Sequence, residues 1–202
     1  MDVAFLSVRE IAKNYSGMDE FRMFQLWHLM GEAAKLDGGD VIEVGCGHGG
    51  SGFVIATQAR RSGVRDRIYL CDTFDGLVKA GPRDTLKNGE MRGPTRADVE
   101  NLMRQYSVPN VIVLEGIVPD DFALGHMAIT FRFAHIDVDI YQSAKDAFEW
   151  LWPRMVKGGI VVLDDYGEAD CPGITELVEE LLPMKDALWF LHGGLQAIAV
   201  RR

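Results

Sequence analysis

Five short apolar runs, separated by stretches of helical periodicity, dominate the middle of this 202-residue chain. Each run is the length of one strand and largely apolar, without polar alternation, which is typical of a strand buried on both faces. The expected strands are Val41–Val44, Ile68–Cys71, Val111–Leu114, Phe131–Ile136 and Ile160–Leu163. The expected helices between them are Gly52–Ser62, Arg96–Tyr106 and Tyr141–Trp152. This alternation predicts an α/β fold with a parallel sheet that helices cover on both faces.

The two ends of the chain depart from this alternation. Residues 1–38 are expected to be a helical segment, because apolar side chains recur there at helical spacing until Gly38-Gly39. A helix is expected at Glu176–Leu182. Two short strands, Leu188–Leu191 and Ala197–Val200, then flank a Gly-Gly turn, which predicts a hairpin whose last strand is antiparallel. A parallel sheet with this ending is unusual among nucleotide-binding folds.

Length and charge narrow the class of protein. A chain of 202 residues is most simply one domain, residues 1–202. A net charge of −9 without long Lys/Arg runs argues against a nucleic-acid partner, and no apolar stretch approaches the roughly 20 residues of a membrane span. The three cysteines show no CxxC spacing, which argues against disulfides or zinc and fits a reducing cytoplasm. Small molecules are the expected partners.

One segment, residues 75–95, fits neither a strand nor a helix. It contains four glycines, two prolines and charges of both signs. A connection of this length is expected to be either a mobile lid over an active site or a disordered surface insertion.

A glycine-rich turn follows the first expected strand and opens the next helix. Gly45, Gly47 and Gly50 match the pattern GxGxxG, with Ser51 directly behind them. Glycines let a backbone turn sharply and approach a ligand closely. The pattern alone is weak, because it fits both a dinucleotide pyrophosphate at the helix N-terminus and the phosphate-free ligand S-adenosylmethionine.

An acidic residue before this turn favours S-adenosylmethionine. Glu43 ends the first strand, where a carboxylate would repel a pyrophosphate but would suit the methionine ammonium group. Asp72 ends the next strand and is expected to bind ribose hydroxyls under either interpretation. A purely structural turn, with Glu43 as a solvated or helix-capping acid, is the remaining alternative.

Two acidic clusters follow two other expected strands. If these strands are neighbours, Asp137, Asp164 and Asp165 meet at one edge of the sheet, where they repel each other unless a cation lies between them. Oxygen ligands favour Mg²⁺ or a similar divalent cation. The alternative is that Asp164 and Asp165 simply end a strand. Asp139 is expected to cap the following helix, because Gln142 follows at capping-box spacing.

A cation at this point suggests transfer chemistry. It would draw an acceptor hydroxyl into its coordination shell and lower the pKa of that hydroxyl, and the resulting alkoxide would attack the sulfonium methyl group. Asp137, or the metal alone, is the expected base. His135 is expected to be a packed core histidine, and Lys145 to face solvent.

Several strings together resemble the macrocin O-methyltransferase (TylF-type) family. They are Glu43-Val44-Gly45, Asp72-Thr73-Phe74-Asp75-Gly76-Leu77, His135-Ile136-Asp137-Val138-Asp139-Ile140-Tyr141, Pro153-Arg154, Gly158-Gly159 and Asp164-Asp165-Tyr166. The resemblance implies a Rossmann-like class I methyltransferase fold with a mostly parallel seven-stranded sheet. It also implies S-adenosylmethionine as methyl donor, Mg²⁺ dependence, and the sugar hydroxyl of a natural product as acceptor.

The resemblance also assigns roles to residues. Asp137, Asp164 and Asp165 match the metal triad, and Asp137 also matches the proposed base and a cofactor contact. The cofactor pocket is matched by Glu43, Gly45, Gly47, Ser51, Asp72, Thr73 and Phe74, with Glu115 and Gly116 at the adenine edge. Ile140 stands where catechol-type enzymes have a catalytic lysine. The family's N-terminus, which is longer than this one, contributes to the substrate pocket and to dimer contacts, so a homodimer is among the expected assemblies.

Two other functions compete with methyl transfer. The glycine pattern with Asp72 also fits an NAD(P)-dependent Rossmann oxidoreductase. The third hypothesis is a non-catalytic relative that binds the cofactor as a scaffold or sensor.

Overall fold

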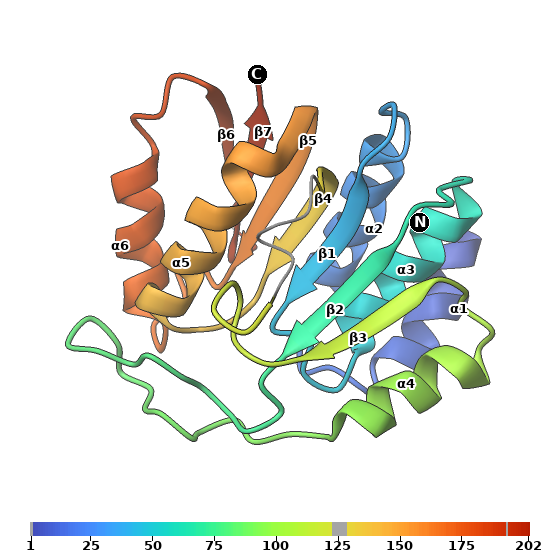
Figure 1. Ribbon diagram of the computed structural model, residues 1–202, viewed down its shortest axis with the longest axis horizontal. Coiled ribbons are helices and arrows are strands. Elements are labelled where there is room, and N and C mark those ends of the chain that lie inside the picture. Colours follow the sequence, from blue (N-terminus) through green and yellow to red (C-terminus); the bar gives the residue numbers. More distant parts are fainter. Residues whose placement is uncertain (1, 123–128, 193) are drawn as a thin grey trace.

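In the computed structural model, which describes residues 2–122, 129–192 and 194–202, the chain folds around one seven-stranded sheet (Figure 1). The strands lie in the order β3-β2-β1-β4-β5-β7-β6. They are β1 (Asp40–Val44), β2 (Ile68–Asp72), β3 (Val111–Glu115), β4 (Phe131–Ile136), β5 (Met155–Asp164), β6 (Ala187–His192) and β7 (Gln196–Arg201). Strands β1 to β5 run parallel to one another, and β7 runs antiparallel between β5 and β6. The predicted sheet and its C-terminal hairpin are confirmed, although Gly193 of the expected turn lies outside the described residues.

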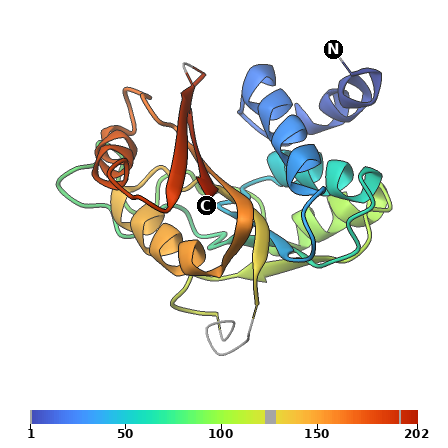
Figure 2. The same ribbon diagram turned by 90° about the horizontal axis from the view of Figure 1, so that it is seen from above.

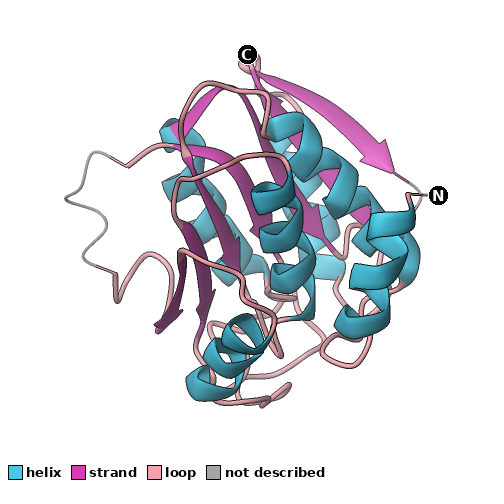
Figure 3. Cartoon of the chain, turned by 90° about the vertical axis from the view of Figure 1, so that its right-hand side faces the viewer, coloured by secondary structure: helices cyan, strands magenta, loops and turns pink. Residues whose placement is uncertain are grey.

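Helices cover both faces of the sheet. They are α1 (Val3–Ala12), α2 (Glu20–Ala33), α3 (Gly50–Arg61), α4 (Arg96–Gln105), α5 (Tyr141–Leu151) and α6 (Pro172–Leu181), with a 3₁₀ turn at Trp152–Arg154. One hydrophobic core joins α1 to α4 to one face, and a second joins α5 and α6 to the other. Figures 2 and 3 show this layering from two further directions.

The two cores explain why the central strands are apolar on both faces over most of their length. In β1, Val41 enters the core beneath α1 to α4, whereas its neighbour Ile42 enters the core beneath α5 and α6. In β4, Phe133 likewise enters the core beneath α1 to α4, and Ala134 enters the core beneath α5 and α6. Because successive side chains of a strand point to opposite faces, a sheet covered on both faces favours apolar residues at consecutive positions.

Helix boundaries differ from the sequence prediction at both ends of the chain. The N-terminal segment contains two helices, because Asp2 caps the first and Asp19 the second through bonds from the backbone N–H groups of Ala4 and of Phe21 and Arg22. Helix α6 begins at Pro172, ahead of the expected Glu176, since proline is well suited to the first turn of a helix.

The direction of strand order reverses between β1 and β4, which is where ligands bind in sheets of this type. The turn after β1 passes very close to the end of β4. Gly45 has a φ of +88°, and a Cβ built on it would lie 1.7 Å from the carbonyl oxygen of Asp137. Only glycine fits here, and its close contact with Asp137 sets the spacing between the ends of β1 and β4.

We predict that Gly45→Ala lowers the free energy of unfolding by about 3 kcal/mol or more, because the added methyl group collides with backbone and the φ angle is strained. Gly47→Ala is the matched control. Gly47 also has a positive φ, +48°, but nothing lies within 4 Å of the place that its added methyl group would take, so about 1 kcal/mol is expected. Urea denaturation of the ligand-free proteins measures both. Equal losses in the two variants would contradict the close approach.

Candidate active site

A cavity of about 500 Å³ opens at the carboxyl edge of the sheet. Four parts of the chain surround it: the glycine turn, the ends of β2, β4 and β5, the connection between α1 and α2, and the 75–95 segment. Parallel strands direct their carboxyl ends to one edge, so residues far apart in the sequence meet here.

Most of the predicted cofactor residues line this cavity. They are Gly45, Gly47, Ser51, Asp72, Thr73, Gly116 and Asp137. The carboxylate of Asp72 accepts two backbone N–H groups, from Gly47 and from Phe74, each at 2.8 Å. Asp72 therefore holds the glycine turn against the end of β2.

Three predicted cofactor residues lie outside the cavity lining. Phe74 packs against the core beneath α1 to α4, and Glu115 is exposed at the end of β3. Glu43 is fully buried, with one carboxylate oxygen beneath Gly52 of α3. The expectation that Glu43 meets the methionine ammonium is corrected, because its side chain points into the layer between sheet and helices.

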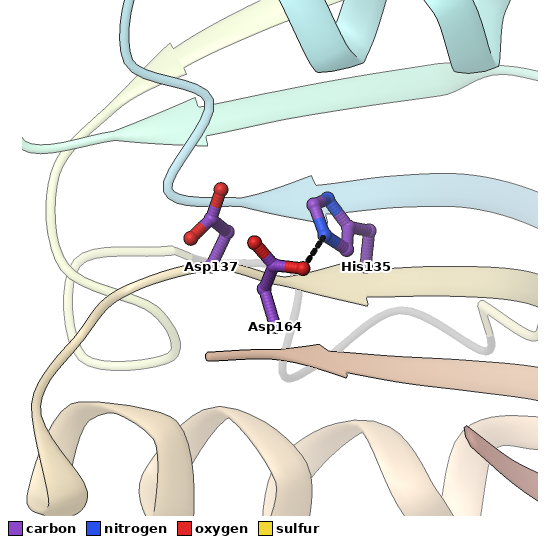
Figure 4. A group of neighbouring side chains, drawn as sticks. All are labelled: His135, Asp137 and Asp164. Atoms are coloured by element: carbon purple, nitrogen blue, oxygen red, sulfur yellow. Dashed lines mark ion pairs between the residues drawn. The ribbon is translucent and has the colours of Figure 1, made fainter. Parts of the chain in front are cut away.

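Glu43 instead begins a buried polar row that crosses four adjacent strands. Its Oε1 lies 2.9 Å from Nδ1 of His135 on β4, and Nε2 of His135 lies 4.0 Å from Oδ1 of Asp164 on β5. Gln196 on β7 donates to the same oxygen of Asp164 at 2.7 Å. Figure 4 shows His135 and Asp164 with Asp137 beside them. We call Glu43, His135, Asp164 and Gln196 the polar row.

Charge holds the polar row together. Burial alone would lower the pKa of His135, but the carboxylates of Asp164 and Glu43 outweigh it and raise the pKa to about 10. His135 is therefore an imidazolium between two carboxylates. The prediction of a packed core histidine is right about its burial but missed its charge. The side chains of Glu43, His135 and Asp164 point to the same face of the sheet and lie near the same edge. Their positions within the expected strands are the sequence signal that could have revealed the row.

The acid cluster, which we define as Asp137, Asp164 and Asp165, lines the cavity as predicted. Burial, together with the charges of Asp164 and Asp165, raises the pKa of Asp137 well above its usual range. Burial, together with Asp164 and Asp139, likewise raises the pKa of Asp165. Among the described residues, none donates a hydrogen bond to the carboxylate of Asp137, which leaves it available to a ligand.

The predicted helix cap is wrong. Helix α5 is preceded by Ile140, and no side-chain hydrogen bond caps it. Asp139 has a φ of +59° and directs its carboxylate toward Cys171, whose Sγ lies 3.6 Å away. Gln142 bonds to Asp146 within its own helix. The expected capping box fails because the chain makes a tight turn at Asp139 before the helix begins.

Sequence reasoning missed one cation entirely. Arg22, in the first turn of α2, places Nη1 at 2.8 Å from Oδ2 of Asp164 and 3.0 Å from Oδ1 of Asp165. Its Nε donates to Asp19, the cap of the same helix, at 2.8 Å. Burial alone would lower the pKa of Arg22, but the nearby carboxylates, above all Asp164, outweigh it and raise the pKa. The helical periodicity of residues 1–38 does not indicate which strand residues α2 would contact.

Residues 12–184 match the family described as Macrocin-O-methyltransferase (TylF). The chain belongs to this macrocin O-methyltransferase family. The family predicted from the sequence motifs is thereby confirmed.

Two O-methyltransferases are similar in sequence to this chain. It is 28% identical over 156 residues to the 8-demethyl-8-(2,3-dimethoxy-alpha-L-rhamnosyl)-tetracenomycin-C 4'-O-methyltransferase of Streptomyces olivaceus, covering 69% of this chain and 58% of the relative. It is 27% identical over 153 residues to the demethyldecarbamoylnovobiocin O-methyltransferase of Streptomyces niveus, covering 70% and 57%. The alignments thus span less than two thirds of the length of these two relatives.

Solved structures of methyltransferases share the fold. The O-methyltransferase NovP superposes with a TM-score of 0.76 at 22% identity, covering 89% of this chain and 79% of NovP. The calicheamicin methyltransferase CalS11 superposes with a TM-score of 0.72 at 17% identity, covering 97% and 90%. The predicted class I methyltransferase fold is confirmed. Within the described residues, no helix combines the length and apolar character that crossing a membrane requires.

In this member of the family, the 75–95 segment forms one wall of the cavity. All of its residues are described, and they form neither helix nor strand. Lys79 pairs with Asp146 of α5 at 2.5 Å and with Asp120 at 2.7 Å, and Ser143 donates to the carbonyl of Val78 at 2.8 Å. These bonds attach the segment to α5, and its two interpretations, a mobile lid or a surface insertion, both stay predictions.

We predict strong energetic coupling within the polar row. Removing one member of a buried ion pair costs about 3–5 kcal/mol, because the other charge remains buried without its partner. A double-mutant cycle of Glu43→Gln and His135→Gln, measured by urea denaturation, should give a coupling of about 2 kcal/mol or more.

The exposed pair of Arg96 and Glu100 on α4, 2.8 Å apart, is the matched control. The same cycle there should give about 0.3–0.5 kcal/mol, since water screens exposed helix pairs. A coupling between Glu43 and His135 as small as the control value would refute the charged row.

Proposed function

We propose that this protein is an S-adenosylmethionine-dependent O-methyltransferase that acts on a hydroxyl of a small molecule with the help of Mg²⁺. One observation carries the proposal: the acid cluster and the glycine turn with Asp72 open into the same cavity. A site for a cationic methyl donor and a site for a hydroxyl acceptor thereby lie side by side. Membership of a methyltransferase family supports the proposal.

The residues around the glycine turn fit the methyl donor. Bound S-adenosylmethionine supplies an activated methyl group on a positively charged sulfonium. Gly45 and Gly47 present bare backbone to the cavity, and Asp72 retains acceptor capacity for ribose hydroxyls beside its two backbone bonds. Gly116, Ile117 and Val118 line the cavity beyond Asp72, where an adenine edge is accommodated. The excess of carboxylates nearby favours a cationic ligand.

The chemistry of the donor set fits a divalent cation. Asp137, Asp164 and Asp165 offer carboxylate oxygens to one cavity, which suits Mg²⁺. Their ligand atoms are divided: those of Asp137 and Asp164 lie within 4.8 Å of each other and of His135, whereas Asp165 groups with Asp139 and Cys171. His135 is not among the proposed ligands, because Mg²⁺ prefers oxygen donors. We therefore propose that the acid cluster holds Mg²⁺, whose Lewis acidity would lower the pKa of an acceptor hydroxyl.

Asp137 is the residue placed to take the acceptor proton. Its carboxylate faces the cavity and accepts no hydrogen bond from the described residues, so it is free to take a proton from an acceptor hydroxyl. Asp164 cannot take this role as readily, because Gln196 and Arg22 occupy its two oxygens. Asp137 is thus the carboxylate that accepts the proton, whereas Asp164 is held in the polar row.

The acceptor is proposed to be a sugar hydroxyl of a glycosylated natural product. The relatives similar to this chain include enzymes named for rhamnosyl-tetracenomycin, for novobiocin and for mycinamicin III. In this protein, the apolar side chains of Leu77, Val78 and Met91 line the same cavity as the acid cluster. An apolar wall next to polar groups suits a sugar carried by an apolar ring system.

We predict that Asp137→Asn lowers the rate of methyl transfer by about a hundredfold or more, because it removes the proposed base and a metal ligand. Binding of S-adenosylhomocysteine, measured by calorimetry, should change little. Transfer is followed by mass spectrometry of a panel of glycosylated acceptors. Chelation with EDTA should lower the rate of the unmodified protein to a similar extent.

Asp37→Asn, which neutralises an exposed aspartate, is the control and should leave the rate unchanged. Full activity of Asp137→Asn would refute the assigned base, and full activity in EDTA would refute the metal. Cofactor binding without transfer to any acceptor, in the unmodified protein with Mg²⁺, would favour the non-catalytic scaffold.

A further inference from the structure

We infer that Arg22 is a resident cation of the acid cluster and that a divalent cation binds there by displacing it. Metal binding would then be coupled to the start of α2, which forms part of the cavity wall. The inference rests on the proposed function, because it assumes that the acid cluster is the metal site. It adds that Arg22, a residue of the N-terminal helices, sets the affinity of the acid cluster for the divalent cation.

The contacts of Arg22 carry the first step. One nitrogen, Nη1, lies within hydrogen-bond distance of both Asp164 and Asp165, so it bridges two of the three proposed ligands. The side chain of Arg22 is 14% exposed and that of Asp164 1%, so water screens the pair weakly. Arg22 is the only lysine or arginine that forms an ion pair with the acid cluster in the part of the chain that the structure describes.

The second step is competition for the same oxygens. Gln196 donates to Oδ1 of Asp164, and Arg22 donates to Oδ2. No oxygen of Asp164 is therefore without a polar partner. Gln196 belongs to the sheet, whereas Arg22 reaches the oxygen on a flexible stem from a neighbouring helix. A metal ion that takes Asp164 and Asp165 as ligands displaces Arg22 more easily than it displaces Gln196.

The third step is that Arg22 has another partner. Its Nε already donates to Asp19, which is half-exposed and caps the same helix. When Arg22 leaves the cluster, this bond can remain, so the guanidinium is not stranded without a counter-ion. Asp19 directly follows Tyr15–Met18, which line the cavity. Metal binding would therefore be coupled to this part of the cavity wall.

The test measures metal binding rather than turnover. We predict that Arg22→Gln binds Mn²⁺ about ten- to a hundredfold more tightly than the unmodified protein in calorimetric titrations, because the metal no longer displaces a charge-assisted hydrogen bond. Arg96→Gln removes the same charge from exposed α4 and should leave the affinity unchanged. Asp164→Asn should abolish binding in both backgrounds, which assigns the signal to the acid cluster.

Two outcomes overturn the inference, and they differ in what else they overturn. Equal Mn²⁺ affinity in Arg22→Gln and the unmodified protein refutes the displacement but leaves the metal site standing. Absence of Mn²⁺ binding in every variant refutes both the displacement and the proposed metal dependence.

A second measurement does not depend on that variant folding. In the unmodified protein, the Nη–H resonances of Arg22 should shift on titration with Mg²⁺ and saturate with the affinity of a calorimetric Mg²⁺ titration, and resonances that do not move contradict the inference. Arg22→Lys should bind Mn²⁺ with intermediate affinity, since lysine keeps the charge but lacks the separate nitrogens, Nε and Nη1, with which Arg22 contacts Asp19 and the acid cluster.

Discussion

The polar row ties the position of the site to the register of the sheet. Glu43 and His135 are direct partners between β1 and β4, and Asp164 and Gln196 are direct partners between β5 and β7. A slip of one residue in any of these strands would turn a charged side chain into the other core, where it has no partner. The row therefore fixes three strand pairings, and with them the edge that carries the acid cluster.

The same charges tie the N-terminal helices to the sheet. Glu43, Asp137, Asp164 and Asp165 outnumber the cations among them, which are His135 and Arg22. The remaining negative charge is concentrated beside the cavity, where a sulfonium ligand and a divalent cation would balance it. Arg22 supplies part of this balance from α2. The helical segment is thus both a cover for the hydrophobic core and a source of charge for the site.

Sequence reasoning reached the sheet, its hairpin and the convergence of Asp137, Asp164 and Asp165, because strand ends and their acidic residues are local patterns. Sequence reasoning could not identify the side chains that pair with these acids. Arg22 lies 142 positions before Asp164, and no periodicity reports which helix residue meets which strand. Glu43 was misassigned for the same reason: its distance from the glycine turn is visible in the sequence, but the burial of its side chain against His135 is not.

The central claim is that the acid cluster is a cation site coupled to Arg22. A crystal structure of the protein with S-adenosylhomocysteine and Mn²⁺, with anomalous data at the manganese edge, tests it most directly. We expect an anomalous peak between Asp137, Asp164 and Asp165, with the guanidinium of Arg22 moved away from Asp164 and still paired with Asp19. A ligand-bound structure without a peak, in which Arg22 still bridges Asp164 and Asp165, would contradict it.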